Sequence, residues 1–384
     1  MRKKRLLIDV NTILSYVQYG YLTGIGRTTY ELLKQWNRFY DEIPFEIMLY
    51  SQNTKRVSTK GLFKFRSLHF YWPNRDGYKR WLYPLRLRKF VSGYDLLHIP
   101  HNVDVMEDVR HTILTIHDVI AYRFADTWHS DTWKFPDEEK RQLEYAAREC
   151  KAIITCSEYS KSDIVRYLHV PESKVHVIPW GVNREMFNPT SDAEYLRRIG
   201  VNGMYYFTSS ANHPRKNLSL LLDSYRSYLT MGGQGQLVVL NPEEEHLKGV
   251  QDLIAEGKII TLRKISDREL AVLYTGAQCS LMLSSYEGFG LPVLESLACG
   301  TQVICARNSS LTEAGGDIVD YVDDMDTTLI ASKMRGYDDR VKADILDATI
   351  LEEHLQNFTW ERCARKYIRF YMAQLNLFED HKAL

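Results

Sequence analysis

Short apolar runs alternate along the chain with longer stretches in which apolar residues recur every three or four positions. The runs are typical of buried strands, and the longer stretches are typical of amphipathic helices. The predicted strands are residues 6–10, 45–50, 96–99, 112–116, 152–156, 175–178, 205–208, 236–240, 259–262, 279–283 and 302–306. The predicted helices are residues 27–36, 137–149, 161–167, 218–228, 267–274, 291–299 and 360–375. This alternation predicts an α/β fold of parallel sheets with helices on both faces.

Proline and glycine residues interrupt this rhythm about halfway along the chain, at 179–183 and again at 188–190. A chain of 384 residues is long enough for two domains of ordinary size. We therefore expect a first domain over 1–182 and a second over 183–360, with the helical segment 361–384 packing back on the first. Doubly wound domains bind ligands at the carboxyl ends of their strands, so we expect the two domains to face a shared cleft.

The composition of the chain limits which binding partners and which cellular compartment it suits. The 49 Lys and Arg balance the 49 Asp and Glu, which argues against a polyanionic partner such as a nucleic acid. The six cysteines show no metal-ligand spacing, and three lie in apolar runs, as buried thiols in a reducing compartment do. Asp9 and Asn11 interrupt the first apolar run, so it is interpreted as a strand and not as a signal peptide. No run reaches the roughly 18 apolar residues of a membrane span. We expect a cytoplasmic protein, at most peripheral on the inner face of the cell membrane.

The segment 285–300 has the most informative chemistry. Glu287 and Glu295 bracket a Gly-Phe-Gly-Leu-Pro turn between a predicted strand and a predicted helix. Pro292 suits the first turn of that helix, and Gly300 suits its C-terminal cap. Free backbone amides and the helix dipole attract an anion, whereas the two acids are suited to accept hydrogen bonds from hydroxyls. A ligand that has both phosphates and hydroxyls is a nucleotide-diphosphate sugar.

Four motifs in this order and spacing resemble one known family. They are Gly24-Ile25-Gly26-Arg27, the pair His117-Asp118 after what is expected to be the fourth strand, Pro214-Arg215-Lys216-Asn217-Leu218, and the E-x7-E pair Glu287 and Glu295. The chain resembles the family 4 retaining glycosyltransferases, of the GT-B fold with two Rossmann-like domains, and within them the bacterial mannosyltransferases of surface polysaccharide synthesis. Two segments depart from the family pattern. Arg263-Lys264-Ile265 replaces a usual glycine near the nucleobase, and Ser209-Ser210-Ala211-Asn212-His213 lacks the glycines of the turn after the first C-domain strand.

The resemblance implies a role for each motif. The implied donor-binding residues are Gly24, Gly26, Arg215, Lys216, Glu287, Gly288, Phe289, Gly290, Leu291 and Glu295. Arg215 and Lys216 would hold the diphosphate and stabilise charge on the leaving phosphate. Glu287 would bind hydroxyls of the transferred sugar, and Glu295 those of the ribose.

The implied catalytic residues are His117, Asp118, Arg215, Lys216 and Glu287. No protein nucleophile is expected, because in retaining enzymes of this fold the departing phosphate is thought to act as the base. No cofactor and no metal are expected: the acidic run 323–326 lies in a late loop and suits a solvated turn. Each assignment has a purely structural alternative. Arg215 and Lys216 would then be a solvated basic pair, and Glu287 and Glu295 would be surface acids. His117 would be a core histidine, and Gly24 and Gly26 would form a plain turn.

Residues 55–89 form a basic, aromatic stretch with eleven Lys or Arg and Asp76 as the one acid. Cations interleaved with Trp and Tyr suit an anionic membrane surface, where a polyprenyl-diphosphate-linked glycan would serve as acceptor. A solvated helical face is an equal alternative, and nucleic-acid binding is a minor one.

The sequence thus predicts a retaining glycosyltransferase. The favoured reaction moves mannose from GDP-mannose to a glycan or lipid-linked glycan in polysaccharide or O-antigen synthesis. The alternatives are a UDP- or dTDP-sugar donor, a catalytically silent glycan-binding scaffold, and a nucleotide-sugar epimerase, against which the E-x7-E pattern argues.

Overall fold

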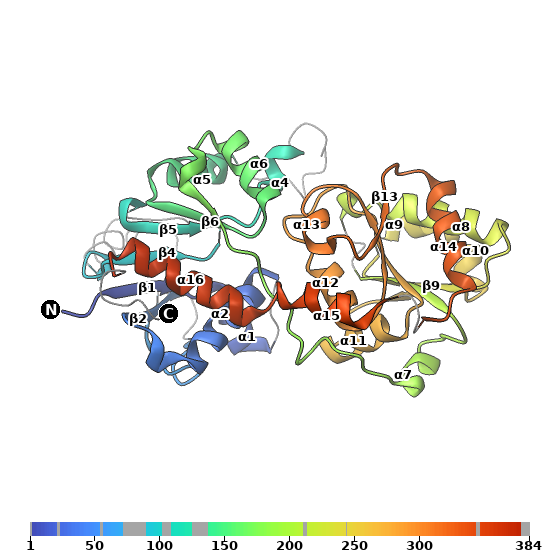
Figure 1. The fold of residues 1–384 in the computed structure, drawn as a ribbon, viewed down its shortest axis with the longest axis horizontal. Coiled ribbons are helices and arrows are strands. Elements are labelled where there is room, and N and C mark those ends of the chain that lie inside the picture. Colours follow the sequence, from blue (N-terminus) through green and yellow to red (C-terminus); the bar gives the residue numbers. More distant parts are fainter. Residues whose placement is uncertain are drawn as a thin grey trace. The chain divides into compact units, whose positions relative to one another are not determined.

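The computed structural model describes residues 2–20, 24–53, 57–71, 90–101, 109–124, 137–209, 213–242, 244–342 and 346–377. The chain forms two compact units, one of residues 1–180 with 360–384 and the other of residues 181–359. Each unit has an α/β architecture around one parallel sheet (Figure 1), so the predicted fold class is confirmed. The domain boundaries predicted from the sequence lie after residues 182 and 360. In the described part of the chain, no helix is long and apolar enough to cross a membrane.

The first unit is built on a seven-stranded sheet with strand order β3-β2-β1-β4-β5-β6-β7. Its strands are β1 (Arg5–Asp9), β2 (Glu46–Asn53), β3 (Arg66–Tyr71), β4 (Leu96–Ile99), β5 (Thr112–Thr115), β6 (Ala152–Thr155) and β7 (Val175–Val177). Its α-helices are α1 (Leu14–Tyr19), α2 (Gly24–Arg38), α4 (Ile120–Arg123), α5 (Asp137–Glu149), α6 (Glu158–Leu168) and α16 (Trp360–Gln374). The 3-10 turns are η1 (Asn11–Ile13), η2 (Tyr40–Glu42), η4 (Val109–His111) and η6 (Glu172–Lys174).

Alternate residues of β1 face opposite sides of this sheet, because side chains of a strand alternate. Leu6 and Ile8 join a core with α2 and α16, whereas Leu7 joins the core formed with α5 and α6. The C-terminal helix α16 is therefore an integral part of the first unit (Figure 1). Trp36 Nε1 donates to the carbonyl of Ala364 at 3.0 Å, which ties α16 to α2.

The second unit has a six-stranded sheet with order β10-β9-β8-β11-β12-β13, the order of a doubly wound nucleotide-binding fold. Its strands are β8 (Tyr205–Thr208), β9 (Gln236–Leu240), β10 (Ile259–Leu262), β11 (Cys279–Met282), β12 (Val303–Ala306) and β13 (Asp320–Val322). Its α-helices are α7 (Ala193–Arg198), α8 (Leu218–Thr230), α9 (Glu244–Leu247), α10 (Gln251–Ala255), α11 (Asp267–Gly276), α12 (Leu291–Ala298), α13 (Leu311–Gly315), α14 (Thr327–Asp338) and α15 (Ala348–Gln356). The 3-10 turns are η7 (Pro214–Lys216) and η8 (Lys248–Val250).

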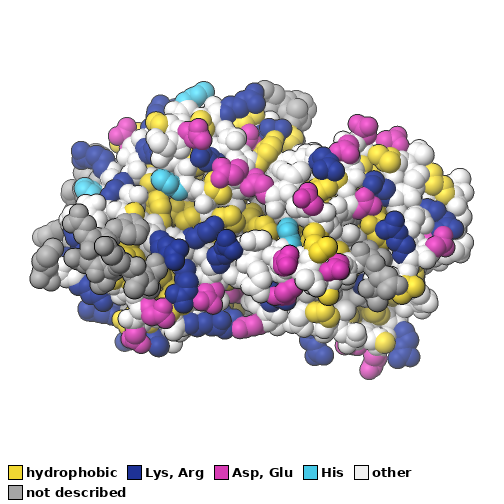
Figure 2. Space-filling view, in the orientation of Figure 1, with side chains coloured by type: hydrophobic (Ala, Val, Ile, Leu, Met, Phe, Trp, Pro, Cys, Tyr) yellow, Lys and Arg dark blue, Asp and Glu magenta, His cyan; other side chains and the backbone are white. Residues whose placement is uncertain are grey.

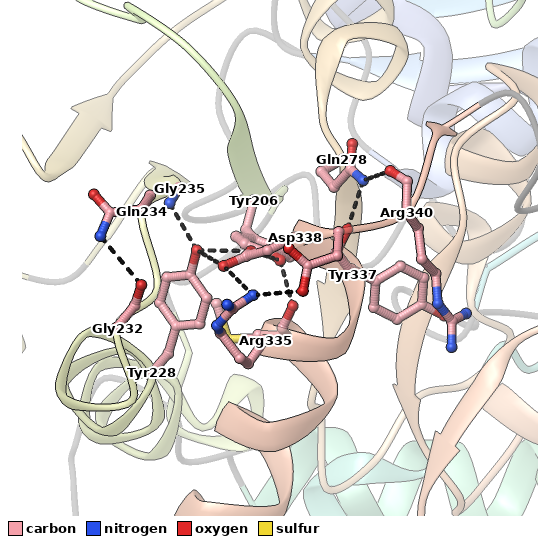
Figure 3. Close-up of polar contacts among 12 residues, drawn as sticks. Tyr206, Tyr228, Gly232, Gln234, Gly235, Gln278, Arg335, Tyr337, Asp338 and Arg340 are labelled. Carbon is pink, nitrogen blue, oxygen red and sulfur yellow. Dashed lines mark hydrogen bonds and ion pairs between the residues drawn. The ribbon is translucent and has the colours of Figure 1, made fainter.

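A buried carboxylate joins α14 to α8 and β8 in this unit (Figure 3). Asp338, at the end of α14, accepts hydrogen bonds from Tyr206 at 2.7 Å and from Tyr228 at 2.8 Å. The side chain of Asp338 is 8% exposed, and Arg335 lies 3.4 Å from it. A buried hydroxyl requires a hydrogen-bond partner, and Asp338 provides an acceptor for both of these phenols.

All eleven predicted strands are present, and two others were missed. One is β13, a short edge strand, and the other is β3, in the basic stretch. The alternative of a helical face is therefore wrong for residues 66–71, whereas residues 55–56 and 72–89 of that stretch lie outside the described residues. The six cysteines are buried and unbridged.

Candidate active site

The sequence motifs of the second unit meet at the point where its strand order reverses. The chain runs outward from β8 in one direction and from the neighbouring β11 in the other. The turn 213–217 follows β8, and the loop 283–290 follows β11. In parallel sheets the carboxyl ends of two such strands open a crevice for ligands. The sheet topology therefore brings the two segments together.

Backbone hydrogen bonds join this turn to this loop. Ser285 N–H donates to the carbonyl of Arg215 at 2.8 Å. Asn217 adopts the left-handed conformation, with φ 52°, and its Nδ2 donates to the carbonyl of Leu283 at 2.8 Å. At the other end of the turn, Nδ1 of His213 accepts from Arg215 N–H at 3.2 Å and caps η7. The backbone of the Pro-Arg-Lys-Asn motif is thus held at both ends.

Arg215, Lys216 and Glu287 form one charge cluster. Arg215 Nη1 lies 2.6 Å from Glu287 Oε2 and also donates to the carbonyl of Tyr286 at 3.0 Å. Lys216 Nζ bonds the other carboxylate oxygen, Oε1. The Lys216 and Glu287 side chains are 10% and 12% exposed, so solvent screens this cluster only weakly. Two cations and one anion leave a net positive charge.

The pKa of Glu287 reflects these neighbours. Burial alone would raise the pKa, but the adjacent Lys216 and Arg215 outweigh burial and lower the pKa to about 2. Burial lowers the pKa of Lys216, and Arg215 adds to this effect, whereas Glu287 and Glu295 oppose it. Glu287 therefore stays ionised at any physiological pH, and it acts as a hydrogen-bond acceptor and not as an acid.

The loop from Glu287 to Leu291 leads directly into α12. Glu287 N–H donates to Ser309 Oγ at 3.0 Å, and Ser310 Oγ donates to the carbonyl of Glu287 at 2.7 Å. Gly290 has φ 102°, and a Cβ at this position would lie 3.1 Å from Cβ of Ala314. Glycine is therefore required by conformation and by space. Because α12 begins at Leu291, directly after this loop, the positive end of its dipole faces the loop, and Gly290 has no side chain to cap it.

Glu295 lies one turn into α12, as predicted, and is half-buried. Tyr274, on α11, points its hydroxyl at Glu295 Oε2 over 3.4 Å. Pro292 lies in the first turn of α12 and Gly300 follows its end with φ 75°, which confirms both end signals.

His117 and Asp118 belong to the first unit and follow β5, the fifth strand and not the fourth, because β3 was missed. His117 is buried, and its Nε2 lies 3.2 Å from the carbonyl oxygen of Pro100. Burial lowers the pKa of His117 to about 4, so the ring is neutral at pH 7. Asp118 Oδ1 accepts from Ile120 N–H at 3.1 Å.

Gly24 and Gly26 do not form the expected loop before a helix at Arg27. Both lie in the first turn of α2, which begins at Gly24. Small residues at this place still allow close approach of a ligand to the helix backbone. The segment Arg263-Lys264-Ile265, where a glycine was expected, contains Lys264 with φ 53°, a conformation that favours glycine.

The structure therefore brings Arg215, Lys216, Glu287 and Glu295 together in the second unit, while His117, Asp118, Gly24 and Gly26 lie in the first. Sequence reasoning missed His213 and Tyr274, which contact this set. Only their positions hinted at a role: His213 directly precedes the Pro-Arg-Lys-Asn motif, and Tyr274 lies near the end of the helix that follows Ser266. Within the described ranges, no three His, Cys, Asp or Glu side chains are placed to hold a metal ion.

Two family models match the chain. The model described as Glycosyltransferase Family 4 matches residues 22–186, and the one described as Glycosyl transferases group 1 matches residues 199–320. O-antigen chain mannosyltransferase B of Escherichia coli is 26% identical over 378 residues, which covers 91% of this chain and 96% of the relative. The chain is a glycosyltransferase, with the family 4 model over 22–186 and the group 1 model over 199–320. The glycosyltransferase is also 32% identical to MMP alpha-(1->4)-mannosyltransferase of Mycolicibacterium hassiacum over 184 residues, covering 47% of this chain and 42% of that protein.

Solved structures support the GT-B fold of this glycosyltransferase. Sucrose-phosphate synthase from Thermosynechococcus elongatus superposes with a TM-score of 0.70 at 16% identity, covering 98% of this chain and 100% of the other. HepE from Anabaena, in complex with UDP and glucose, superposes with a TM-score of 0.69 at 15% identity, covering 97% and 100%. These structures confirm the predicted fold, and the family models together with the named relatives confirm the predicted transferase activity.

Proposed function

We propose that this glycosyltransferase moves a hexose, with retention of configuration, from a nucleotide-diphosphate sugar to a glycan or lipid-linked glycan of a surface polysaccharide such as O-antigen. The observation that carries the proposal is the cluster of Arg215, Lys216 and Glu287 at the point where the strand order reverses. Mannose from GDP-mannose is the favoured donor, because a relative aligned along 91% of the chain is named an O-antigen mannosyltransferase.

The chemistry follows from the charges of the cluster. Cleavage of the sugar–phosphate bond builds negative charge on the leaving diphosphate, and fixed cations stabilise that charge most when they are already in place. Arg215 and Lys216 supply these cations, and Glu287 accepts hydrogen bonds from the sugar hydroxyls. Glu295 accepts hydrogen bonds from the ribose hydroxyls. The departing phosphate takes the proton of the incoming hydroxyl, while we assign His117 and Asp118 to the reacting side of the transferred sugar.

A UDP-sugar is the second candidate donor, and one observation favours it. HepE, which shares the fold, has been solved with UDP-glucose. Donor hydrolysis and transfer with GDP-mannose, UDP-glucose and dTDP-sugars, followed by nuclear magnetic resonance of the anomeric product, separates the candidates. Turnover of UDP-sugars alone would refute the GDP choice, and an inverted product would refute retention. Turnover should not change with EDTA, since the proposed chemistry relies on side-chain cations.

We further propose that the first unit docks on an anionic membrane through a basic surface that includes α16. Arg362, Lys366 and Arg369 are exposed on α16, and basic side chains gather over this helix (Figure 2). Arg365 of the same helix bonds Glu42, in η2, at 3.1 Å. Lys64 of the basic stretch lies 5.9 Å from the ring of Tyr40, also in η2. The described part of the stretch therefore continues the surface of α16, and such a surface attracts acidic lipids.

Vesicle flotation tests this docking. Wild-type protein should float with phosphatidylserine-containing vesicles at low salt and should be released at high salt. Replacement of Lys366 and Arg369 by Gln should weaken binding, whereas replacement of Arg226 and Lys258, which belong to the second unit, should not. Failure to bind anionic vesicles at low salt would refute the docking and leave the transfer reaction untouched.

A further inference from the structure

Tyr274 is a fully buried tyrosine whose ring is fixed by aromatic neighbours. The ring packs edge-on against Phe207, with centroids 5.1 Å apart, and against Phe187 at 6.3 Å. Its backbone carbonyl accepts from Thr301 Oγ1 at 2.6 Å. A ring held on two sides cannot rotate away, so the direction of its hydroxyl is determined by the fold.

The hydroxyl of Tyr274 is aimed at the candidate ribose-binding carboxylate. It donates to Glu295 Oε2 over 3.4 Å, a long hydrogen bond. Burial raises the pKa of Tyr274 well above its usual value, and the Glu295 carboxylate raises it further, while Ser209 acts in the opposite direction. The phenol is therefore protonated at any physiological pH and can only donate to the carboxylate.

The Lys216 ammonium group competes with the Tyr274 hydroxyl for the Glu295 carboxylate. The carboxylate raises the pKa of Lys216, which shows that Glu295 lies within the electrostatic field of this ammonium group. Lys216 belongs to the diphosphate end of the site. A Glu295 side chain without the phenol would be drawn toward that ammonium, since glutamate has several rotatable bonds and α12 exposes it in part.

We propose that Tyr274 is a positioning residue that holds the Glu295 carboxylate where the ribose hydroxyls reach it, and that it thereby makes the site selective for ribonucleotides. This inference rests on the proposed donor site. An ionised carboxylate has about four acceptor positions, so one can take the phenol while others take the 2′- and 3′-hydroxyls. A nucleotide without those hydroxyls gains nothing from the orientation of Glu295.

The test compares ligands and variants together. Calorimetric titration would measure Kd for GDP and UDP and for their 2′,3′-dideoxy forms, with wild-type protein, Tyr274→Phe and Tyr205→Phe. Tyr205→Phe is the matched control, because Tyr205 is also buried and its hydroxyl donates at 2.8 Å to Leu273, the residue before Tyr274. Glu295→Gln provides the reference for loss of the ribose contact.

We expect wild-type protein to prefer the ribose form by about 10-fold or more, as hydrogen bonds to a charged group allow. Tyr274→Phe should weaken ribonucleotide binding about 3- to 10-fold and leave dideoxynucleotide binding unchanged. Tyr205→Phe should leave the preference intact. A merely structural role for Tyr274 would weaken both ligands equally.

The outcomes distinguish this inference from the proposed function. If Glu295→Gln abolishes the preference but Tyr274→Phe retains it, the positioning role is wrong and the donor site stands. If wild-type protein binds none of the four nucleotides, the proposed function is itself refuted. Because Phe preserves the ring packing, the variant should fold, and its unfolding midpoint would verify this. Should it unfold, a Tyr274→Met variant, which fills much of the same space without the hydroxyl, would take its place.

Discussion

Arg215 Nη1 lies 2.6 Å from Glu287 Oε2, and this contact joins a turn after β8 to a loop after β11. The same carboxylate bonds Lys216 through its other oxygen. Glu287 thus partly offsets two cations, and its charge opposes any anion that approaches them. The cluster keeps a net positive charge, so an anion is still attracted. Binding of nucleotide and binding of sugar are therefore expected to respond differently to changes at Glu287.

The first prediction concerns Glu287→Gln. The change adds one net positive charge, so Kd for the nucleoside diphosphate should stay equal or fall. Sugar transfer should decrease about 10- to 150-fold, because a charged acceptor for the sugar hydroxyls is lost. Calorimetry and steady-state kinetics measure the two effects, with Glu352→Gln, at an exposed pair with Arg184, as the control. Parallel loss of nucleotide affinity and transfer would contradict the assigned role.

The second prediction concerns Arg215→Lys. A lysine keeps the charge, but it lacks the planar fork that lets a guanidinium bind phosphate oxygens through two nitrogens; in Arg215, Nη1 alone makes the contacts to Tyr286 and Glu287. Nucleoside diphosphate affinity should therefore fall about 10-fold or more. Arg226→Lys is the matched control, since Arg226 pairs with Asp252 on the surface of the same unit. Unchanged affinity in Arg215→Lys would show that charge alone suffices.

The third prediction concerns pH and His213. Burial, Arg215 and Lys216 lower the pKa of this imidazole to about 4, whereas Glu287 opposes the shift. The folded state thus favours neutral His213, whose Nδ1 accepts from Arg215 N–H. The unfolded chain binds the proton more tightly, so this contribution to stability is complete above about pH 6.5 and is lost as the pH falls toward about 4.

His213→Asn should remove that pH dependence and keep the cap, because Asn is also a good N-cap residue. Urea unfolding between pH 7.5 and 4 should show wild-type protein losing stability relative to the variant. His213→Ala should lose about 1 kcal/mol at pH 7.5 through loss of the cap. The exposed His111→Asn is the control. Identical pH profiles of wild type and His213→Asn would refute this account.

The fourth prediction concerns the Asp338 carboxylate at the end of α14 (Figure 3). Asp338→Ala leaves the buried hydroxyl of Tyr228 without its acceptor, whereas the Tyr206 hydroxyl keeps the carbonyl of Met334; the change should lower the free energy of unfolding by about 1–3 kcal/mol. Asp339→Ala, one residue later, removes a contact to the same Arg335 from an 84% exposed side chain. It should change stability by no more than about 0.5 kcal/mol. Equal effects of the two variants in urea unfolding would contradict the role of the buried network.

Periodicity predicted most of the fold, because buried parallel strands are short apolar runs that need no distant information to recognise. Leu96–Ile99 and Cys279–Met282 are examples. The strand β3 was missed because it is an edge strand with Arg66 and His69 in it, and its polar residues resemble those of a solvated surface. The start of α2 at Gly24 was missed because glycines usually disfavour a helix, and only packing of the helix on the sheet overrides that preference.

The sequence by itself determined which chemical groups this protein has: two adjacent cations after one strand, and two carboxylates around a glycine turn after another. It also determined the ends of α12 through Pro292 and Gly300, since helix termini depend on local backbone preferences. Only the tertiary structure decided that Glu287 pairs with both Arg215 and Lys216, and that Tyr274 points at Glu295. Those relationships depend on strand order, because the reversal between β8 and β11 places side chains distant in sequence within hydrogen-bonding distance.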